Sequence, residues 1–378
     1  MPEKTIERRC FLKLGLAAGA VGAAALAMPK FSLAAVKSIK FSDCQAMSPV
    51  KMAENSRLVM DSWKYLKATV ETIKDPGIRK TVKEILANPA PTLAEDLMDG
   101  KNRKQVYGEL KAKGYVEKIA YDQFLPAVND PGRSPFPFYA GPGSGYSSHH
   151  SYPGGLVTHT AANLVISLSI YDTYRKVYGF GLNRDMVITS QVLHDLHKPW
   201  VFQWAEDGES RTELSLAGTG EHHSLSVAES FKRGLPAEFC VAQACAHNHP
   251  GFPKEEAGPV NWITTAGILL GIDPREKGLL SPDGKTLPRP RRMENFVCHL
   301  GDHDWILTVP AAKWLIPVLQ RIAQEEYGLE KSDLKTKKFN QFRNYVFSQA
   351  TIMTLYETYS TKGYKELLGV VKAMVAKG

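Results

Sequence analysis

The chain has 378 residues, of which 43% are hydrophobic and 23% charged, and its formal net charge is +8. This composition is ordinary for a soluble globular protein, and the length suits one large domain or two small ones. After the first forty residues, no stretch approaches the ~20 uninterrupted apolar residues that a membrane-spanning helix needs. The mild positive charge favours anionic ligands but does not establish nucleic-acid binding.

The first 35 residues resemble a twin-arginine export signal. Arg8-Arg9-Cys10-Phe11-Leu12-Lys13 precedes a weakly hydrophobic run from Leu14 to Met28, and Ser32-Leu33-Ala34 supplies the small residues of a signal-peptidase site. The resemblance implies a bacterial protein that the twin-arginine export machinery carries, already folded, to the periplasm or the cell exterior. Cleavage after Ala34 removes five basic and two acidic residues, which lowers the net charge from +8 to +5 and leaves no stable membrane span. The alternative is an N-terminal membrane anchor that is never cleaved.

Four cysteines lie beyond that segment, and none of them forms a CxxC pair. They are Cys44, Cys240, Cys245 and Cys298. Cys240 and Cys245 stand five residues apart on one predicted helix, which is poor geometry for a disulfide. We expect these cysteines to be small buried hydrophobic residues, although an oxidising compartment permits some pairing.

The region from Ser48 to about Gly114 has a helical pattern. Ser48-Pro49 is typical of an N-cap followed by proline at the first helical position. Prolines between Asn88 and Thr92 break the pattern, and a further helix is expected from near Thr92. Residues 129–155 are rich in Pro, Gly and aromatic side chains and predict a long loop, which is a linker, borders a site, or does both.

After Leu156 the pattern is again helical. The predicted helices run through His159 to about Val177, from about Arg184 to His197, from near Gly220, from Pro236 to His249-Pro250, and from about Arg292 through Asp302. A Pro/Gly/Arg loop covers 273–292, and the last third is amphipathic helix. The fold class is therefore all-α. We divide the chain into a signal peptide (1–35), an N-terminal helical region (36–128), a main domain with its Gly/Pro-rich loop (129–310) and a C-terminal helical extension (311–378).

A series of histidines and aspartates recurs on successive predicted helices. The members are His159, His194, Asp195, His222, His247 and Asp302. A lone histidine is ordinarily a surface or core residue, but this shared order favours a metal site between facing helices. Four imidazoles and two carboxylates suit two divalent ions about 3.5–4 Å apart, bridged by Asp195, which can activate a water and bind phosphoryl oxygens. Such ligands do not distinguish Mn, Fe, Zn, Ni and Co.

Longer motifs surround these residues. They are Ser-His-His-Ser-Tyr-Pro-Gly-Gly-Leu-Val-Thr-His159, Leu-His194-Asp195-Leu-His-Lys198, Glu-His222-His223-Ser-Leu-Ser, Ala-His247-Asn-His249 and Glu294-Asn-Phe-Val-Cys-His-Leu-Gly-Asp302. From about Ser147 to Asp304 the chain thereby resembles the HD-domain superfamily of metal-dependent phosphohydrolases. The first motif is most similar to the HD domains of bacterial 3′-to-5′ exoribonucleases and of relaxase-associated proteins. The resemblance implies an HD-domain helical bundle with additional N- and C-terminal helices.

The resemblance also implies roles for the ligands. His159, His194, Asp195 and Asp302 would hold the first metal, and His222 and His247 would complete the second. Three alternatives stay open: His223 in place of His222, His249 in place of His247, and Asp304 or Asp273 in place of Asp302.

Two catalytic residues follow from the same resemblance, the bridging Asp195 and Lys198. Lys198 matches a lysine that often follows the His-Asp pair, and it would neutralise phosphate charge in the transition state; otherwise it is a surface lysine. His197 replaces the glycine that usually stands before that lysine. Four residues in or beside the Gly/Pro loop are candidates for substrate contacts, with loop packing as the alternative: Arg133, His149, His150 and Tyr152.

The leading hypothesis is a phosphohydrolase, a phosphodiesterase or phosphomonoesterase that acts on a phosphorylated small molecule, a nucleotide or an oligonucleotide. Against a processive nuclease, no companion nucleic-acid domain is evident. A second hypothesis is an HD-fold mixed-valent di-iron oxygenase, because the same ligands serve iron. A third is a non-catalytic binding module, which the complete ligand series disfavours. The sequence does not indicate the oligomeric state.

Overall fold

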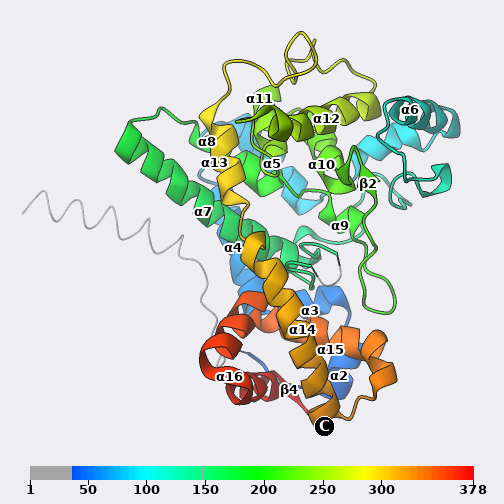
Figure 1. Ribbon diagram of the computed structural model, residues 1–378, viewed down its shortest axis with the longest axis vertical. Helices are drawn as coiled ribbons and strands as arrows, with labels where there is room; N and C mark the ends of the chain where they lie inside the picture. Colours follow the sequence, from blue (N-terminus) through cyan, green and yellow to red (C-terminus); the bar gives the residue numbers. More distant parts are fainter. Residues whose placement is uncertain (1–35, 146–147) are drawn as a thin grey trace, which may run out of the picture.

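The computed structural model describes residues 36–145 and 148–378. Within these ranges the chain is almost entirely helical, which confirms the all-α prediction and is consistent with an HD-domain bundle (Figure 1). The α-helices are α2 (Phe41–Ala46), α3 (Pro49–Asn55), α4 (Arg57–Val70), α5 (Pro76–Ala87), α6 (Gly100–Ala112), α7 (Gly155–Tyr178), α8 (Arg184–Leu193), α9 (Lys198–Val201), α10 (Glu221–Lys232), α11 (Ala237–Ala244), α12 (Pro253–Leu270), α13 (Met293–Gly301), α14 (Trp305–Tyr327), α15 (Lys337–Ala350) and α16 (Ile352–Met374). Short 3₁₀ turns lie at Thr92–Leu97, Tyr121–Gln123, Phe138–Ala140 and Lys331–Lys335.

The described strands form two minimal ladders. β1 (Ile39–Lys40) pairs in parallel with β4 (Val375–Ala376), with Ile39 opposite Val375. β2 (Ser215–Leu216) pairs antiparallel with β3 (Thr219–Gly220) just before α10. The first ladder joins segments more than 330 residues apart, and the second is a hairpin that leads into the helix carrying His222.

The buried apolar side chains form two main cores. The larger core is built from helices α4 through α8 together with α10, α11 and α12. It surrounds the segments that carry the histidines. The smaller core joins Cys44 and Met52 to the inner faces of α14, α15 and α16. In Figure 1 this smaller core forms the lower lobe, and α14 extends into it from the larger one. Residues 36–55 therefore pack with the C-terminal helices, while the division of the chain into the predicted segments stays a prediction.

Helix α7 is the element around which the candidate residues gather. It packs against α4, α8 and α13. The close approach of α13 requires Gly301, because a Cβ atom there would lie 1.8 Å from Oγ of Ser167 on α7. Asp302 directly follows this contact and is thereby held beside His159.

The Gly/Pro-rich loop is folded back against the start of α7. Gly155 makes this possible, since a Cβ atom there would lie 1.8 Å from the carbonyl oxygen of His150. The backbone N–H of Gly143 donates to that same carbonyl at 2.9 Å. Arg343 of α15 donates to the carbonyl oxygen of Ser151 at 2.5 Å. The predicted long loop is present, and it is tied to both cores.

Several predicted helices are confirmed. Ser48 caps α3 by accepting from the N–H of Lys51, with Pro49 at the first helical position. The helix through His159 and the helix that begins near Gly220 are present as α7 and α10. The four cysteines of the described residues are free and buried, as expected.

Two predicted helices are shorter than expected. α8 ends at Leu193 rather than at His197, because the N–H of His197 donates to Oγ of Ser226 at 3.1 Å and not to the carbonyl of Leu193. α11 ends at Ala244 rather than at His249, because the N–H of Ala246 donates to the carbonyl of Gln243 in a tighter turn. His194, Asp195, His247 and Asp302 therefore lie at helix ends or just beyond them and not within helices as predicted.

Helix α12 was not predicted. Its sequence contains Gly258 and Pro259, which together read as a break. The proline is accommodated because the carbonyl of Glu255, which would accept from residue 259, accepts from the side-chain amide of Asn248 at 3.4 Å. This helix packs against α10 and places Trp262 beside the histidines.

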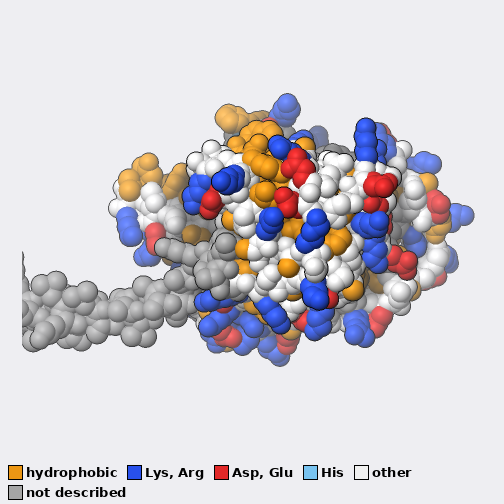
Figure 2. Space-filling view, turned by 90° about the horizontal axis from the view of Figure 1, so that it is seen from below, with side chains coloured by type: hydrophobic (Ala, Val, Ile, Leu, Met, Phe, Trp, Pro, Cys, Tyr) orange, Lys and Arg blue, Asp and Glu red, His pale blue; other side chains and the backbone are white. Residues whose placement is uncertain are grey.

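The twin-arginine motif falls on residues 1–35, outside the described residues, and stays a prediction. By length and composition alone, Met293–Tyr327 passes as a membrane span, but it comprises α13 and α14, and 44% of its most apolar window is buried inside the fold. On the face of the smaller lobe seen in Figure 2, basic and acidic side chains are interspersed, without a continuous basic stripe.

Candidate metal centre

Six candidate ligands converge from five segments of the chain. His159 lies in the first turns of α7, His194 and Asp195 follow α8, His222 lies on α10, His247 follows α11 and Asp302 follows α13. His159, His194 and Asp195 are buried, with side-chain exposures of 1%, 0% and 0%. The side chain of His247 is 14% exposed, so the cluster opens to solvent on its side.

The first group consists of four nitrogen and oxygen atoms at nearly equal spacing. Nε2 of His159 lies 3.4 Å from Nε2 of His194, 3.3 Å from Oδ2 of Asp195 and 3.2 Å from Oδ1 of Asp302. Nε2 of His194 lies 3.2 Å from Oδ2 of Asp195 and 3.4 Å from Oδ1 of Asp302. Two ligands each about 2.1 Å from one ion at tetrahedral angles stand roughly 3.4 Å apart. The spacing therefore fits a single small cation.

The second group faces the other oxygen of Asp195. Oδ1 lies 3.2 Å from Nε2 of His222 and 3.6 Å from Nε2 of His247. Ligand atoms of His222, His223 and His247 all lie within 4.8 Å of one another, as do those of His159, His194 and Asp302. Asp195 thus directs one oxygen at each group and meets both His222 and His247 with the second. Asp302 also reaches both groups, since its Oδ2 lies 3.1 Å from Nδ1 of His247.

Hydrogen bonds fix the orientation of three imidazoles. Nδ1 of His194 donates to the carbonyl of Gln191 at 2.7 Å. Nδ1 of His222 lies 2.5 Å from Oε1 of Glu213, and Nδ1 of His159 lies 3.2 Å from Oδ1 of Asp304. Acceptors at Nδ1 leave the Nε2 lone pair free for a cation, which is the usual arrangement around metal-bound histidine.

The charge balance of the cluster also fits cations. Four carboxylates meet there, those of Asp195, Glu213, Asp302 and Asp304, and within the described residues Lys198 is the one lysine or arginine that forms an ion pair with them. Oδ1 of Asp195 and Nε2 of His247 are buried without a hydrogen-bond partner in the described structure, while Oδ2 of Asp195 is paired with Lys198. Buried charges and lone pairs of this kind need compensation, and divalent cations supply it.

The carboxylates hold protons on the histidines of the metal-free cluster. Burial acts to lower the pKa of His194, but Asp195 and Asp302 outweigh it and raise the pKa to about 9. Burial also acts to lower the pKa of His159, but Asp304 and Asp195 outweigh it and raise this pKa well above its ordinary value. The pKa of Asp195 is held well below its ordinary value by His194 and Lys198, although burial acts to raise it. Protons and cations therefore compete for the same nitrogens.

Lys198 is buried at the centre rather than exposed at the surface. Its Nζ lies 2.5 Å from Oδ2 of Asp195 and donates to the carbonyl of Gly143 at 2.5 Å. It thereby joins the Gly/Pro-rich loop to the candidate bridging carboxylate. Its neighbour His197 is buried against Trp200 and lies 3.6 Å from Glu229, away from the candidate ligands.

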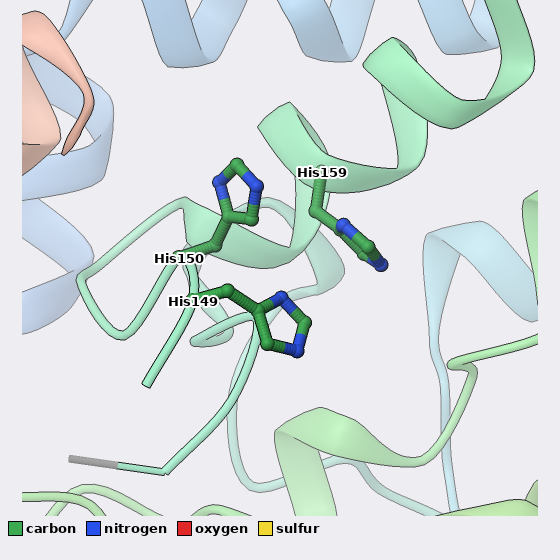
Figure 3. A group of neighbouring side chains, drawn as sticks. All are labelled: His149, His150 and His159. Carbon is green, nitrogen blue, oxygen red and sulfur yellow. The ribbon is translucent and has the colours of Figure 1, made fainter. Parts of the chain in front are cut away.

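The loop histidines lie beside His159. Figure 3 shows His149 and His150 on one loop segment with the ring of His159 facing them from α7. Both loop rings have centroids 5.1 Å from that of His159. Nε2 of His150 lies 2.8 Å from Oδ2 of Asp304, so this ring is engaged behind the ligands. Nδ1 of His149 is buried without a hydrogen-bond partner in the described structure, so His149 is the loop histidine available to a ligand.

The other two substrate-contact candidates lie elsewhere. Tyr152 is fully buried, and its hydroxyl contacts Thr158 at 2.9 Å and Nδ1 of His150 at 3.2 Å, so it supports the loop instead of meeting solvent. Arg133 lines a surface groove with Asn88 and Gln203, and the lining of that groove includes none of the candidate ligands.

Of the alternatives to the ligands, Asp273 and His249 lie away from Asp195, whereas His223 lies within the second group. Asp273 is paired with Arg275 on the exposed 273–292 loop and lies outside the cluster. His249 contacts His299 and Phe296, and no contact of the described structure joins it to Asp195. His223 stacks on His247 with ring centroids 3.8 Å apart, and its Nδ1 lies 2.9 Å from the hydroxyl of Thr219.

Sequence reasoning missed three residues that support the ligands. Glu213 holds His222, and it comes from the irregular segment before β2, where no motif marks it. Asn163 donates to Oδ1 of Asp302 at 2.6 Å, and its position four residues after His159 on α7 is a signal that helical spacing offers. Asp304 was considered only as a ligand, whereas it orients His159.

Comparisons with known proteins give one significant curated similarity. No family model matches the chain, and no solved structure matches it significantly. A dihydroneopterin 2′,3′-cyclic phosphate phosphodiesterase from Methanocaldococcus jannaschii is 34% identical over 180 residues, which are 47% of this chain and 56% of that protein. The chain thus spans a little over half the length of the curated relative it matches. Over those 180 residues the chain is similar to a phosphodiesterase.

Proposed function

We propose that this protein is a metal-dependent phosphohydrolase with a two-ion centre. His159, His194, Asp195 and Asp302 hold one divalent ion, and His222 and His247 complete the second, with Asp195 as the bridge. The observation that carries the proposal is the placement of the two oxygens of Asp195, 3.2 Å from Nε2 of His194 and 3.2 Å from Nε2 of His222. A carboxylate shared in this way is typical of two-ion hydrolytic sites.

The substrate class is a small phosphodiester, with a cyclic phosphate as the first choice. The similar protein is named for a cyclic phosphate of dihydroneopterin, which supports this class. The cluster has one ion-paired lysine among the described residues, Lys198, and that suits one phosphate group better than a polyphosphate or a long polynucleotide. An oligonucleotide that ends in a cyclic phosphate also belongs to the proposed substrate class.

Two ions at this centre would supply Lewis acidity and a nucleophilic water at neutral pH. The chain's own contribution is orientation and hydrogen bonding. Lys198 fixes Asp195 and the Gly143 carbonyl, so the loop that carries His149 closes over the first group. Burial of His159, His194 and Asp195 excludes bulk water from this side of the centre, which strengthens each electrostatic contact.

His223 is proposed as a donor to the phosphate and not as a ligand. The indole N–H of Trp262 donates to the hydroxyl of Thr219 at 2.7 Å, which leaves the hydroxyl proton for Nδ1 of His223 at 2.9 Å. A neutral imidazole that accepts at Nδ1 carries its proton on Nε2. Burial first, and then the charges of His247 and His222, hold the pKa of His223 well below its ordinary value, which keeps the ring neutral.

The proposal includes export. The twin-arginine resemblance of residues 1–35 favours assembly of the metal centre in the cytoplasm before the folded protein reaches the periplasm. Replacing Arg8 and Arg9 by lysine is expected to retain the protein in the cytoplasm, as measured by cell fractionation. Equal periplasmic amounts of the variant and the unaltered protein would count against this route.

The deciding experiment measures metal content and hydrolysis together. Protein loaded with manganese, iron, zinc, nickel or cobalt is assayed on bis-p-nitrophenyl phosphate, 2′,3′-cyclic nucleotides and short RNA. We expect about two ions per chain and hydrolysis of the cyclic phosphates, both lost in Asp195→Asn and both kept in the exposed control Asp273→Asn. Oxygen consumption with a mixed-valent di-iron signal would instead establish the oxygenase, and unchanged metal content in Asp195→Asn would end the two-ion proposal.

A further inference from the structure

A row of imidazole and aromatic rings lies beside the candidate centre. We call His249, His299, His303 and Trp305 the imidazole row. Consecutive ring centroids along it are 4.8, 4.3 and 6.2 Å apart. Trp305 is 46% exposed, and the three histidines are partly buried, so the row has an open face.

The row is attached to the candidate ligands at both ends. His249 stands two residues after His247, and His303 directly follows Asp302. The ring of His299 donates through Nδ1 to the carbonyl of Ala246, at 3.2 Å, immediately before His247. The side chains of His247 and Asp304 are 14% and 15% exposed, whereas those of His159 and His194 are 1% and 0% exposed. The centre therefore opens on the side from which the row starts.

Hydrogen bonds fix what the row presents. Nδ1 of His303 donates to the carbonyl of His299 at 2.6 Å, as Nδ1 of His299 donates to Ala246. In both rings Nε2 is left outside these bonds, and it has no hydrogen-bond partner among the described residues. Burial first, and then the charges of His303 and His249, lower the pKa of His299 to about 4, so this ring is neutral at neutral pH.

Such a row recognises a particular chemistry. Its rings offer π-faces for stacking, and the neutral ring of His299, which donates through Nδ1, keeps an Nε2 lone pair that can accept from an N–H group. A planar heterocycle with ring N–H or amino groups satisfies both properties. A polyanion does not, because the row contains no lysine or arginine.

We infer that the imidazole row binds the planar, N–H-bearing heterocycle of the substrate whose phosphate the two-ion centre hydrolyses. This inference rests on the proposed function and adds its specificity determinant. His249, His303 and Trp305 supply stacking surface, while Nε2 of His299 accepts from the heterocycle. The heterocycle takes no part in the reaction, but its binding to the row makes the protein selective among cyclic phosphates.

The test compares two cyclic phosphates that differ in the heterocycle. Guanosine 2′,3′-cyclic phosphate carries a planar ring with N–H donors, and glycerol 1,2-cyclic phosphate has no ring. In the double variant His303→Ala, Trp305→Ala we expect kcat/KM for the guanosine compound to fall about tenfold, mainly through KM, because stacking on one aromatic ring contributes about that factor. Hydrolysis of the glycerol compound and the metal content stay unchanged.

Trp314→Ala is the matched control. Trp314 lies on the same helix as Trp305, is 49% exposed and stacks on Tyr356 at 5.0 Å, away from the row. We expect both substrates to be hydrolysed normally by this variant. An equal loss for both substrates in the double variant, or no loss for either, would overturn the inference. His299 is not replaced, because its ring also positions Ala246 beside His247.

A binding measurement separates this inference from the proposed function. Saturation-transfer NMR on the zinc-loaded protein uses guanosine 5′-monophosphate and glycerol 1-phosphate as probes. We expect transfer to the guanine protons with the unaltered protein and with Trp314→Ala, and at least a tenfold weaker effect with the double variant. If row-dependent transfer persists while no phosphate ester is hydrolysed, the proposed function fails and the row stands. If esters are hydrolysed without any transfer to guanine, the row is refuted.

Discussion

Nδ1 of His159 lies 3.2 Å from Oδ1 of Asp304, while Nε2 of the same ring faces Asp195 and Asp302. The second oxygen of Asp304 lies 2.8 Å from Nε2 of His150. Asp304 therefore links the Gly/Pro-rich loop to a candidate ligand. A carboxylate behind a metal-bound imidazole fixes its tautomer and raises its basicity.

Replacing Asp304 by asparagine is expected to weaken metal binding about 10- to 100-fold. The asparagine side chain carries no negative charge to face Nδ1 of His159. The imidazole therefore loses both its fixed tautomer and part of its basicity. Competition with a fluorescent chelator measures the affinity. Asp302→Asn, which removes a proposed ligand, is expected to cost more, and the exposed Asp273→Asn nothing. An Asp304→Asn protein that binds metal normally would show that the contact is not used.

His222→Ala is expected to remove one metal equivalent, whereas His223→Ala keeps both. The reason is that Nε2 of His222 faces Oδ1 of Asp195 at 3.2 Å, while Nδ1 of His223 is engaged by Thr219 at 2.9 Å. Elemental analysis of the purified variants measures the count. His223→Ala is expected to lower kcat instead by about 10- to 100-fold, since a donor to the phosphate is lost. The reverse metal counts would exchange the two roles.

Metal binding is expected to release protons and to strengthen as the pH rises towards about 9. Burial acts to lower the pKa of His194, but Asp195 and Asp302 raise it to about 9, so at pH 7 the metal-free ring is protonated. A bound cation requires the neutral ring. For each proton that must be released, the metal affinity therefore rises about tenfold per pH unit until the pH reaches about 9. Calorimetry in buffers of different ionisation enthalpy counts the protons. Binding without proton release would contradict this assignment.

Glu229→Gln is expected to lower the free energy of unfolding by about 1–3 kcal/mol at pH 7. The buried carboxylate accepts from the hydroxyl of Thr92 at 2.7 Å and from the N–H of Leu93 at 2.8 Å. Burial acts to raise its pKa, but His197 and these two donors outweigh burial and lower it. The ionised group therefore stabilises the fold above its unfolded pKa of about 4.3, and this contribution is lost as the pH falls through the lower folded value.

Urea unfolding at pH 7 and at pH 3 measures this effect. The difference between the unaltered protein and Glu229→Gln is expected to shrink at the lower pH. Glu84→Gln is the control, because Glu84 is 55% exposed and lies 3.9 Å from Lys80 in a solvated ion pair. A difference that grows on acidification would mean that the carboxylate is strained and not stabilising.

The sequence was sufficient for the fold class and for most of the cluster. Helical spacing and the capping signal at Ser48 depend on neighbouring residues, so they are readable from the chain alone. The ends of α8 and α11 are not, because they involve partners on other helices: the N–H of His197 donates to Ser226 of α10, and the carbonyl of Ala246 accepts from His299 of α13.

The supporting residues were out of reach because they act across the fold. Glu213 meets His222 from an irregular segment, and Asp304 meets His150 from 154 residues away. Helix α12 was missed because the hydrogen bond that tolerates Pro259 comes from the side chain of Asn248. Tyr152 and Arg133 were both assigned to the substrate on residue type alone, whereas burial and position decide such roles, and neither property is local.

The pairing of β1 with β4 sets an order for events in the cell. Ile39 pairs with Val375 only after the more than 330 residues between them have been synthesised. The smaller core, which joins Cys44 and Met52 to α14, α15 and α16, therefore cannot close before α16 exists. The larger core needs no residue beyond Leu287, so it can form first on the growing chain. The segment that carries the candidate ligands His159 to His247 can thus fold before the lobe beside it is complete.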